Sequence, residues 1–179
     1  MRAAGARGFT LIELMAGIAV LALLLSIGVP SFRDLLAASR LTTLSNNMVT
    51  AIASARGEAR KRGIPVTFCA ANDGVTGCRT DGSWNREWIV FTDDAGGAGT
   101  IDTGDELLDR FPVPPSGYGV TAISPTNLNY IRFMRNGAPD TTASPIRALK
   151  LTRPSCTGNN ARQITVSNTG RATSAKVAC

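Results

Sequence analysis

FTLIELMAGIAVLALLLSIGV, residues 9–29, is a predominantly apolar run in which Glu13 is the single charged residue. A helix rises ~1.5 Å per residue, so a helix of this length crosses a hydrocarbon layer of ~30 Å. The stretch therefore predicts a membrane-spanning helix. The presence of Glu13 needs an explanation, because an isolated carboxylate is costly inside an apolar helix that spans a membrane.

The segment before this helix is short and basic, with Arg2 and Arg7. By the positive-inside rule, these charges orient the N-terminus to the cytoplasm and the rest of the chain outward. An ordinary secretory signal would instead be cleaved after the apolar run, where Ser26, Gly28 and Ser31 offer small residues.

A second helical pattern follows in residues 30–62, after Gly28 and Pro30, which we expect to kink or loosen the helix locally. Apolar residues recur at helical spacing and predict one buried stripe: Phe32, Leu36, Leu44, Met48, Ile52, Ala55 and Ala59. Residues 60–62 are basic, and Gly63 with Pro65 ends the pattern. We therefore predict one long helix whose second half packs on a globular domain. The alternatives for these three cations are a dedicated phosphate site and simple stabilisation by the helix dipole, and we favour the helix dipole.

Residues 63–179 carry short apolar or alternating segments separated by turn residues, which predicts strands. The seven candidates are 65–71, 87–93, 106–113, 118–123, 129–134, 146–152 and 162–167. One amphipathic helix and seven strands predict an α+β fold, with antiparallel sheet covering the apolar stripe. The acidic, glycine-rich residues 92–106 lack the carboxylate spacing of an EF-hand loop, so we expect a flexible hairpin loop and no metal.

The composition argues against several classes of function. The 179 residues include no histidine, which removes the commonest general base and the commonest zinc ligand. No serine lies in a visible nucleophile motif, so we expect neither an enzyme nor a cofactor. The net charge of +6 would fall to +4 without Arg2 and Arg7, a weak indication of a nucleic-acid partner.

Four cysteines follow the membrane segment: Cys69, Cys78, Cys156 and Cys179. An even number behind a membrane-targeting start indicates disulfides in an oxidising compartment. Three pairings are open, and we favour Cys69 with Cys78 and Cys156 with Cys179, because both bonds would close loops that lack regular structure.

The start of the chain resembles a type IV prepilin, because Gly8 and Phe9 are followed by Glu13 ahead of the apolar run. The resemblance implies that prepilin peptidase removes residues 1–8 by cleaving between Gly8 and Phe9 on the cytoplasmic side. It also implies methylation of the new amino terminus and a long N-terminal helix carrying a sheet domain. The apolar helix would then be retained, unlike that of an ordinary signal peptide.

Glu13 gains a physical role under this hypothesis. A carboxylate in an apolar helix should either lose its charge or find a cation. In a helical stack of subunits, the available cation is the amino group at residue 9 of a neighbour. Because a misplaced subunit would leave two buried charges unmatched, this ion pair would fix axial register. We therefore assign Glu13 to assembly.

Later segments resemble the GspH/FimT group of pilins, namely EARKRG at 58–63, PVTFC at 65–69, WIVFTD at 88–93, ELLDRF at 106–111 and the run from residue 162 to the end. Membership implies a minor pilin of the type IV pilus or a minor pseudopilin of type II secretion. As a pilus protein it would insert in the inner membrane, then join other minor pilins and the major pilin at the pilus tip or initiation complex. It would support pilus biogenesis, twitching or adhesion.

Some FimT-type pilins bind DNA through a C-terminal motif of glycine, arginine, any residue and arginine. The corresponding residues 170–173 begin with Gly170 and Arg171 but end in a threonine. Lys176 lies nearby, and a surface shared with Arg162 and Arg153 would give a basic patch for double-stranded DNA. Its phosphate contacts would be independent of base sequence and sensitive to salt. The alternative is that these are ordinary solvated side chains.

Overall fold

The computed structural model describes residues 10–124, 129–142 and 148–179. Gly8 and Phe9, which flank the expected cleavage site, lie outside the described residues. The chain divides into two compact units, Met1–Ala37 and Ala38–Cys179, and each is described by itself below.

Helix α1, Leu11–Arg62, is the only helix among the described residues and contributes to both units. In the first unit it carries the apolar run, and its side chains are exposed. Helical structure continues through Gly28 and Pro30, although proline cannot donate a backbone hydrogen bond. Just beyond Pro30, Ser31 Oγ donates to the Ile27 carbonyl over 3.2 Å.

In the second unit, α1 buries one face beneath the strands. The buried residues are Leu41, Leu44, Ser45, Met48, Ala51, Ile52, Ala55 and Ala59. This confirms the predicted stripe from Leu44 to Ala59. The prediction is wrong for Phe32 and Leu36, which are 60% and 42% exposed in the single chain, because they precede the segment that the strands cover.

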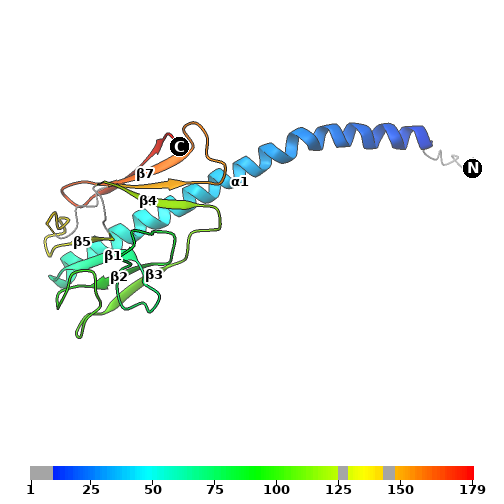
Figure 1. Ribbon diagram of the computed structural model, residues 1–179. Helices are drawn as coiled ribbons and strands as arrows, with labels where there is room; N and C mark the ends of the chain where they lie inside the picture. Colours follow the sequence, from blue (N-terminus) through cyan, green and yellow to red (C-terminus); the bar gives the residue numbers. More distant parts are fainter. Residues whose placement is uncertain (1–9, 125–128, 143–147) are drawn as a thin grey trace, which may run out of the picture. The chain divides into compact units, whose positions relative to one another are not determined.

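The strands form two antiparallel sheets of four strands each, in the orders β3-β2-β1-β5 and β4-β6-β7-β8 (Figure 1). Their bounds are Val66–Ala70 for β1, Trp88–Thr92 for β2, Leu107–Phe111 for β3, Gly119–Ser124 for β4, Tyr130–Phe133 for β5, Ala148–Thr152 for β6, Ala161–Val166 for β7 and Ala172–Val177 for β8. The antiparallel α+β prediction is confirmed, with its strands divided between two sheets. Pro112 follows β3 directly and cannot continue a ladder of backbone hydrogen bonds, so the chain leaves the first sheet there.

Strand β8 is the element that the seven candidates omitted. Its residues, ATSAKV, are small or polar and mostly exposed, so the apolar alternation that signals a strand is weak. Pairing in full register with β7, from Ala161 opposite Val177 to Val166 opposite Ala172, establishes the strand.

The core lies between α1 and the strands and contains a group of aromatic rings. Phe68 lies 5.5 Å from Trp84 and 6.2 Å from Trp88, measured between ring centroids. The Trp88 indole donates to the Trp84 carbonyl over 3.0 Å, so its buried polar atom is satisfied.

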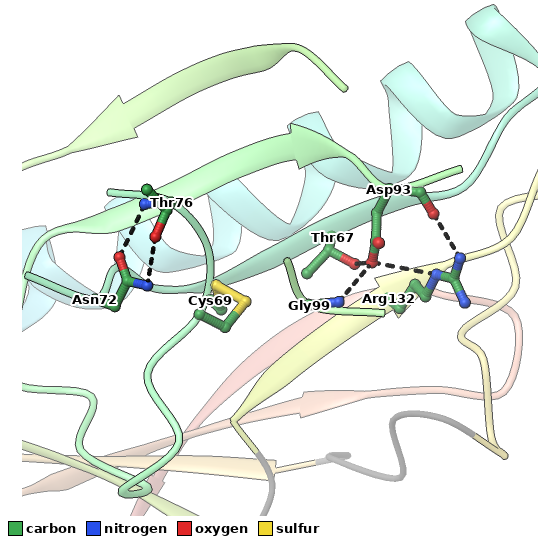
Figure 2. Close-up of a disulfide and its surroundings, with 8 residues drawn as sticks. Thr67, Cys69, Asn72, Thr76, Asp93, Gly99 and Arg132 are labelled. Atoms are coloured by element: carbon green, nitrogen blue, oxygen red, sulfur yellow. Dashed lines mark hydrogen bonds and ion pairs between the residues drawn. A yellow bond between two sulfur atoms is a disulfide. The ribbon is translucent and has the colours of Figure 1, made fainter. Parts of the chain in front are cut away.

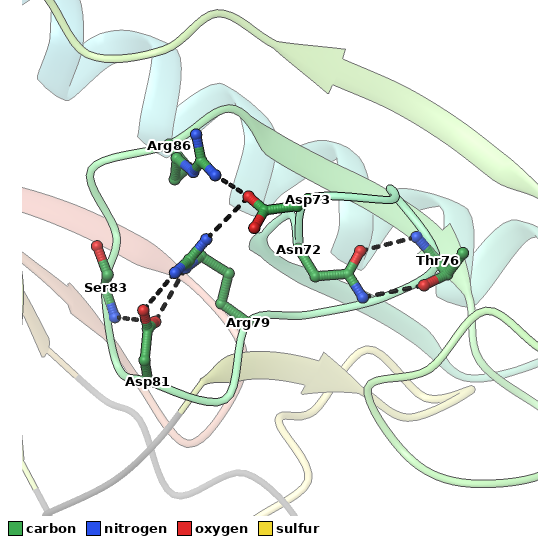
Figure 3. Close-up of polar contacts among 7 residues, drawn as sticks. All are labelled: Asn72, Asp73, Thr76, Arg79, Asp81, Ser83 and Arg86. Carbon is green, nitrogen blue, oxygen red and sulfur yellow. Dashed lines mark hydrogen bonds and ion pairs between the residues drawn. The ribbon is translucent and has the colours of Figure 1, made fainter.

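Two disulfides join Cys69 to Cys78 and Cys156 to Cys179, the pairs that we favoured from the sequence. The first ties the end of β1 to the following loop (Figure 2). Ion pairs stabilise that loop further, since Asp73 binds Arg79 and Arg86, and Arg79 binds Asp81 (Figure 3). The Arg79 side chain lowers the pKa of Asp81 to about 2.

The glycine-rich residues 92–106 connect β2 to β3 and pack against the disulfide loop. Cys78 N donates to the Gly99 carbonyl over 2.8 Å, and Ile101 N donates to the Thr76 carbonyl over 2.9 Å. Asp102 and Asp105 accept hydrogen bonds from the loop's own amides. The expected hairpin connection is therefore present, and its carboxylates hold its backbone in place.

Asp93 forms a buried polar cluster at the start of this loop (Figure 2). Its Oδ2 accepts from Thr67 Oγ1 at 2.5 Å and from Gly99 N at 3.1 Å, and it lies 3.3 Å from Arg132 Nε. Burial raises the pKa of Asp93, while the hydrogen bonds from Thr67 and Gly99 and the charge of Arg132 oppose that rise. The cluster joins β1, the loop and β5.

Replacing Asp93 with alanine should lower the free energy of unfolding by about 3 kcal/mol. It removes the nearer of the two carboxylates from the mostly buried Arg132 cation, leaving Asp140 at 3.6 Å, and it removes the acceptor that Thr67 and Gly99 share. Urea unfolding of the full chain in detergent measures this loss. The neighbouring Asp94 is exposed, so Asp94→Ala should change stability by less than about 0.5 kcal/mol. Equal losses in the two variants would contradict a structural role for the Asp93 cluster.

Candidate functional site

Reciprocal hydrogen bonds between Thr10 and Glu13 cap the N-terminus of α1. Glu13 Oε2 accepts from Thr10 N at 2.9 Å and from Thr10 Oγ1 at 2.8 Å, while Glu13 N donates to Thr10 Oγ1 over 3.3 Å. This is a capping box, which satisfies amides that a helix start leaves unpaired. Thr10 was not among the residues predicted from the sequence, although its spacing of three residues from Glu13 is typical of a capping box.

The helix beyond this cap is long and apolar enough to cross a membrane, judged by length and composition. Its large apolar side chains from Leu11 to Leu36 are exposed in the single chain. Exposed apolar surface of this extent indicates a membrane or a protein partner.

In the second unit, α1 also has an exposed stripe whose spacing alternates between four and three residues. It consists of Ser39, Thr43, Asn46, Thr50, Ala53 and Gly57, all small or uncharged. A side chain added at Gly57 would meet nothing within 4 Å, so this surface is open. Small residues at this spacing allow another helix to approach closely.

The three basic residues of the last helical turn have different surroundings. Arg62 Nε donates to Glu58 over 2.7 Å and its Nη1 donates to Glu106 over 2.5 Å, while Lys61 lies 3.3 Å from Glu58. The hydrogen bond from Arg62 lowers the pKa of Glu58 most, and the hydrogen bond from Lys61 lowers it further. Arg60 has no such ion pair within the described ranges.

Arg60 instead lines a hollow of about 210 Å³ between α1 and the turn from β7 to β8. We call this hollow the arginine groove, and its lining residues are Val49, Ala53, Arg56, Gly57, Arg60, Gly170, Arg171 and Ala172. Across the part of the chain that the structure describes, no carboxylate forms an ion pair with Arg56, Arg60 or Arg171. Three unneutralised guanidinium groups around one hollow favour an anionic ligand.

Two glycines allow the parts of the groove to meet. Gly170 has φ +79°, and a Cβ there would lie 2.1 Å from the Gly137 carbonyl oxygen. The same carbonyl accepts from Arg56 Nε at 3.2 Å, so Arg56 is held against the turn that carries Arg171. The groove therefore depends on a close approach that only glycine permits at residue 170.

The four DNA-binding candidates lie at different places around the β7–β8 hairpin. Arg171 lies in the turn of the β7–β8 hairpin, next to the arginine groove. Arg162 and Lys176 face each other at the open end of that hairpin. Arg153 follows the end of β6, whose Leu151 pairs with Arg162. Arg171 therefore lies at the other end of the hairpin from Arg162 and Lys176, and a basic patch that all four residues share stays a prediction.

Arg56 was not predicted from the sequence as a member of this groove, and Arg60 was explained there as one of three cations that the helix dipole favours. Their spacing of four residues places them on one side of a helix, which was a readable signal. Their proximity to Arg171 was not readable, since the hairpin has to fold back along α1 before they meet.

Comparison with known proteins now gives the class of the protein. Residues 44–170 match the family of the type II transport protein GspH, and residues 4–29 match the prokaryotic N-terminal methylation motif. The protein is thus a minor pilin or pseudopilin of the type IV pilus and type II secretion class. The chain belongs to the GspH family. No curated protein sequence matches it.

A solved structure supports the fold. The crystal structure of the type IV minor pilin FimU from Pseudomonas aeruginosa superposes with a TM-score of 0.54 and 14% identity, covering 75% of this chain and 87% of that chain. The minor pseudopilin EpsH from the type 2 secretion system of Vibrio cholerae gives a TM-score of 0.45 and 12% identity, covering 78% of this chain and 97% of that chain. At 14% identity, the similarity to FimU concerns the fold alone.

The methylation motif implies processing by prepilin peptidase and assembly with other pilins. The same motif and the apolar helix suggest membrane anchoring before assembly. The resemblance to the GspH/FimT group and the predicted fold are both confirmed.

Gly170→Ala should destabilise the chain more than Gly158→Ala, by at least about 1 kcal/mol, in urea unfolding of the full chain in detergent. Both glycines have positive φ, +79° and +59°, so both variants pay a similar backbone cost. Only the Cβ at residue 170 would collide with the Gly137 carbonyl, whereas residue 158 has open space. Equal destabilisation would argue against the close contact between the two turns.

Proposed function

We propose that this protein is a minor pilin of the type IV pilus that is processed between Gly8 and Phe9 and assembled at the pilus tip or initiation complex. There it supports pilus biogenesis, twitching or adhesion. The observation that carries the proposal is Glu13, a carboxylate at the start of an exposed apolar helix that continues into the globular unit. In this proposal the chain has four parts: a leader at 1–8, a membrane helix at 9–29, an amphipathic helical segment at 30–62 and a β-rich domain at 63–179.

Glu13 changes partners during assembly in this proposal. In the single chain, Thr10 donates two hydrogen bonds to its carboxylate, which helps to offset the cost of placing Glu13 in an apolar segment. In the filament, the methylated amino group at residue 9 of a neighbour supplies a full positive charge. In an apolar surrounding, the attraction between two full charges exceeds that of a hydrogen bond from a neutral donor, so correct register is favoured over misplacement.

The exposed stripe of α1 supports lateral packing in the same filament. From Ser39 to Gly57 its residues are short, so a neighbouring helix can approach without displacing long side chains. In this proposal the protein therefore acts through contacts with other subunits and not through catalysis. It places the chain first in the bacterial inner membrane with a cytoplasmic N-terminus, then across the periplasm into an extracellular pilus with other minor pilins and the major pilin.

Deleting the chain from its host should reduce sheared surface pili, and a wild-type copy should restore them. A Glu13→Leu copy should remain at the level of the deletion strain, because it cannot pair with a neighbour's amino group. A Ser54→Ala copy should restore pili, since Ser54 contacts Asp109 within the chain and lies outside the exposed stripe. Immunoblotting of membranes checks that each variant is made.

The same strains distinguish the two filament systems. Parental levels of pili together with loss of type II secretion would contradict the pilus assignment and favour a minor pseudopilin. Full complementation by Glu13→Leu would contradict the role of Glu13 in assembly.

Double-stranded DNA binding in natural transformation is a second candidate function, and the arginine groove is the observation that favours it. Arg171 is joined there by Arg56 and Arg60, which restores the multiple cations that residues 170–173 lack. Guanidinium groups bind phosphate oxygens in a bidentate manner, without reading base sequence.

Arg60→Ala and Arg171→Ala should each weaken DNA binding and reduce the slope of log affinity against log salt concentration by about 0.9. Fluorescence anisotropy with a DNA duplex and the full chain in detergent measures both quantities. Lys61→Ala is the matched control, because Lys61 is paired with Glu58 and lies outside the groove. An unchanged salt slope in both arginine variants would exclude the groove as a DNA site.

A further inference from the structure

The arginine groove and the exposed stripe of α1 share part of their surface. Ala53 and Gly57 belong to the stripe and also line the groove. Two further walls of the groove come from the apolar side chains of Val49 and Ala172. All four residues lie in the second unit. A helix that packs on the stripe at residues 53–57 therefore also covers part of the groove.

Two of the three groove cations are held in position by close packing. A Cβ placed at Gly137 would lie 2.6 Å from Arg60 Cδ and 3.4 Å from Arg56 Cγ, so both side chains pass directly over that turn. Arg56 Nε also donates to the Gly137 carbonyl over 3.2 Å. These two cations are thus positioned before any ligand arrives, and less side-chain entropy remains to be lost on binding.

Covering the groove with a helix has an electrostatic consequence. In the part of the chain that the structure describes, no ion pair neutralises Arg56, Arg60 or Arg171. Removing a cation from water is costly unless an opposite charge pairs with it. A carboxylate is the anion that a polypeptide supplies, and the planar fork of arginine can bind it through two parallel hydrogen bonds. A helix that packs beside the groove therefore has to bring an acidic side chain to it.

We propose that the arginine groove receives an aspartate or glutamate side chain from the helix of a neighbouring pilin subunit. This inference rests on the lateral packing in the proposed function and adds the chemistry of the partner. The small residues of the stripe allow a helix to approach, and the groove selects among approaching helices by charge. A helix without an acidic residue at that position would leave Arg60 and Arg171 covered and unpaired, which disfavours the wrong partner.

The lining of the groove favours an acidic side chain over double-stranded DNA as the occupant in the filament. DNA is bound through hydrated phosphates in wet, polar interfaces, and it gains little from apolar walls such as those of Val49, Ala53 and Ala172. The methylene groups of an aspartate or glutamate can contact those walls while the carboxylate reaches the guanidinium groups. DNA in the groove would also cover Ala53 and Gly57, so one copy of the chain cannot hold both occupants.

Reversing the charge of one groove arginine in the host tests this contact. Arg60→Glu should lower sheared surface pili at least about tenfold, the fall expected when a contact loses about 1.4 kcal/mol. Lys176→Glu is the matched charge reversal, since Lys176 is exposed and lies outside the groove, and it should leave pili at the parental level. Immunoblotting of membranes checks that both variants are made in equal amounts.

A photo-reactive amino acid in place of Ala53, where the stripe meets the groove, identifies the neighbour. In sheared pili it should cross-link to a helical segment of another pilin that contains an aspartate or glutamate. Replacing that acid with glutamine should lower the cross-link yield, and adding Arg60→Glu should then lower it much less than in the presence of the acid, because residues in contact are not additive. Additive effects, a cross-linked segment without an acidic residue, or no cross-link to a pilin would overturn the inference.

The deletion strain separates failure of this inference from failure of the proposed function. Parental pili in Arg60→Glu, with loss of pili in the deletion strain, would overturn the carboxylate contact alone. If that variant also lost DNA uptake, the groove would be assigned to double-stranded DNA instead. Parental pili in the deletion strain itself would overturn the pilus assignment and this inference together.

Discussion

Burial of one face of α1 beneath two antiparallel sheets is the constraint on which the rest of the globular unit depends. Met48, Ile52, Ala55 and Ala59 are fully buried on that face. Because small alanines alternate with larger side chains, the strands can lie close to the helix. The same arrangement leaves the opposite face of the helix free, and that face carries the stripe of small residues that we assign to filament packing.

Backbone contacts that require glycine determine where the polar groups of the second unit meet. The Gly137 carbonyl touches Gly170 and accepts a hydrogen bond from Arg56. These contacts bring a helix, the turn after β5 and the β7–β8 turn together around one hollow. Elsewhere, the side chains of Asp93 and Arg132 connect the loop at residues 92–106 to β1 and β5. The positions of the cations thus follow from the packing of turns.

The two ends of the β7–β8 hairpin carry cations in different settings. At the turn, Arg171 joins two arginines of α1 in the arginine groove. At the open end, Arg162 and Lys176 face each other near Thr42.

The sequence predicted the long helix, the antiparallel α+β class and seven of the eight strands in the described residues, and among three possible pairings it favoured the two disulfides that form. These features follow from local periodicity, turn residues and cysteine positions. It did not predict β8, because ATSAKV has little apolar alternation and becomes a strand by pairing with β7. It also placed Phe32 and Leu36 in a stripe that the strands do not reach. Which arginines share a surface could not be predicted from the sequence, because residues 56 and 171 meet through the folding of a hairpin along a helix, and that contact leaves no local pattern in either segment.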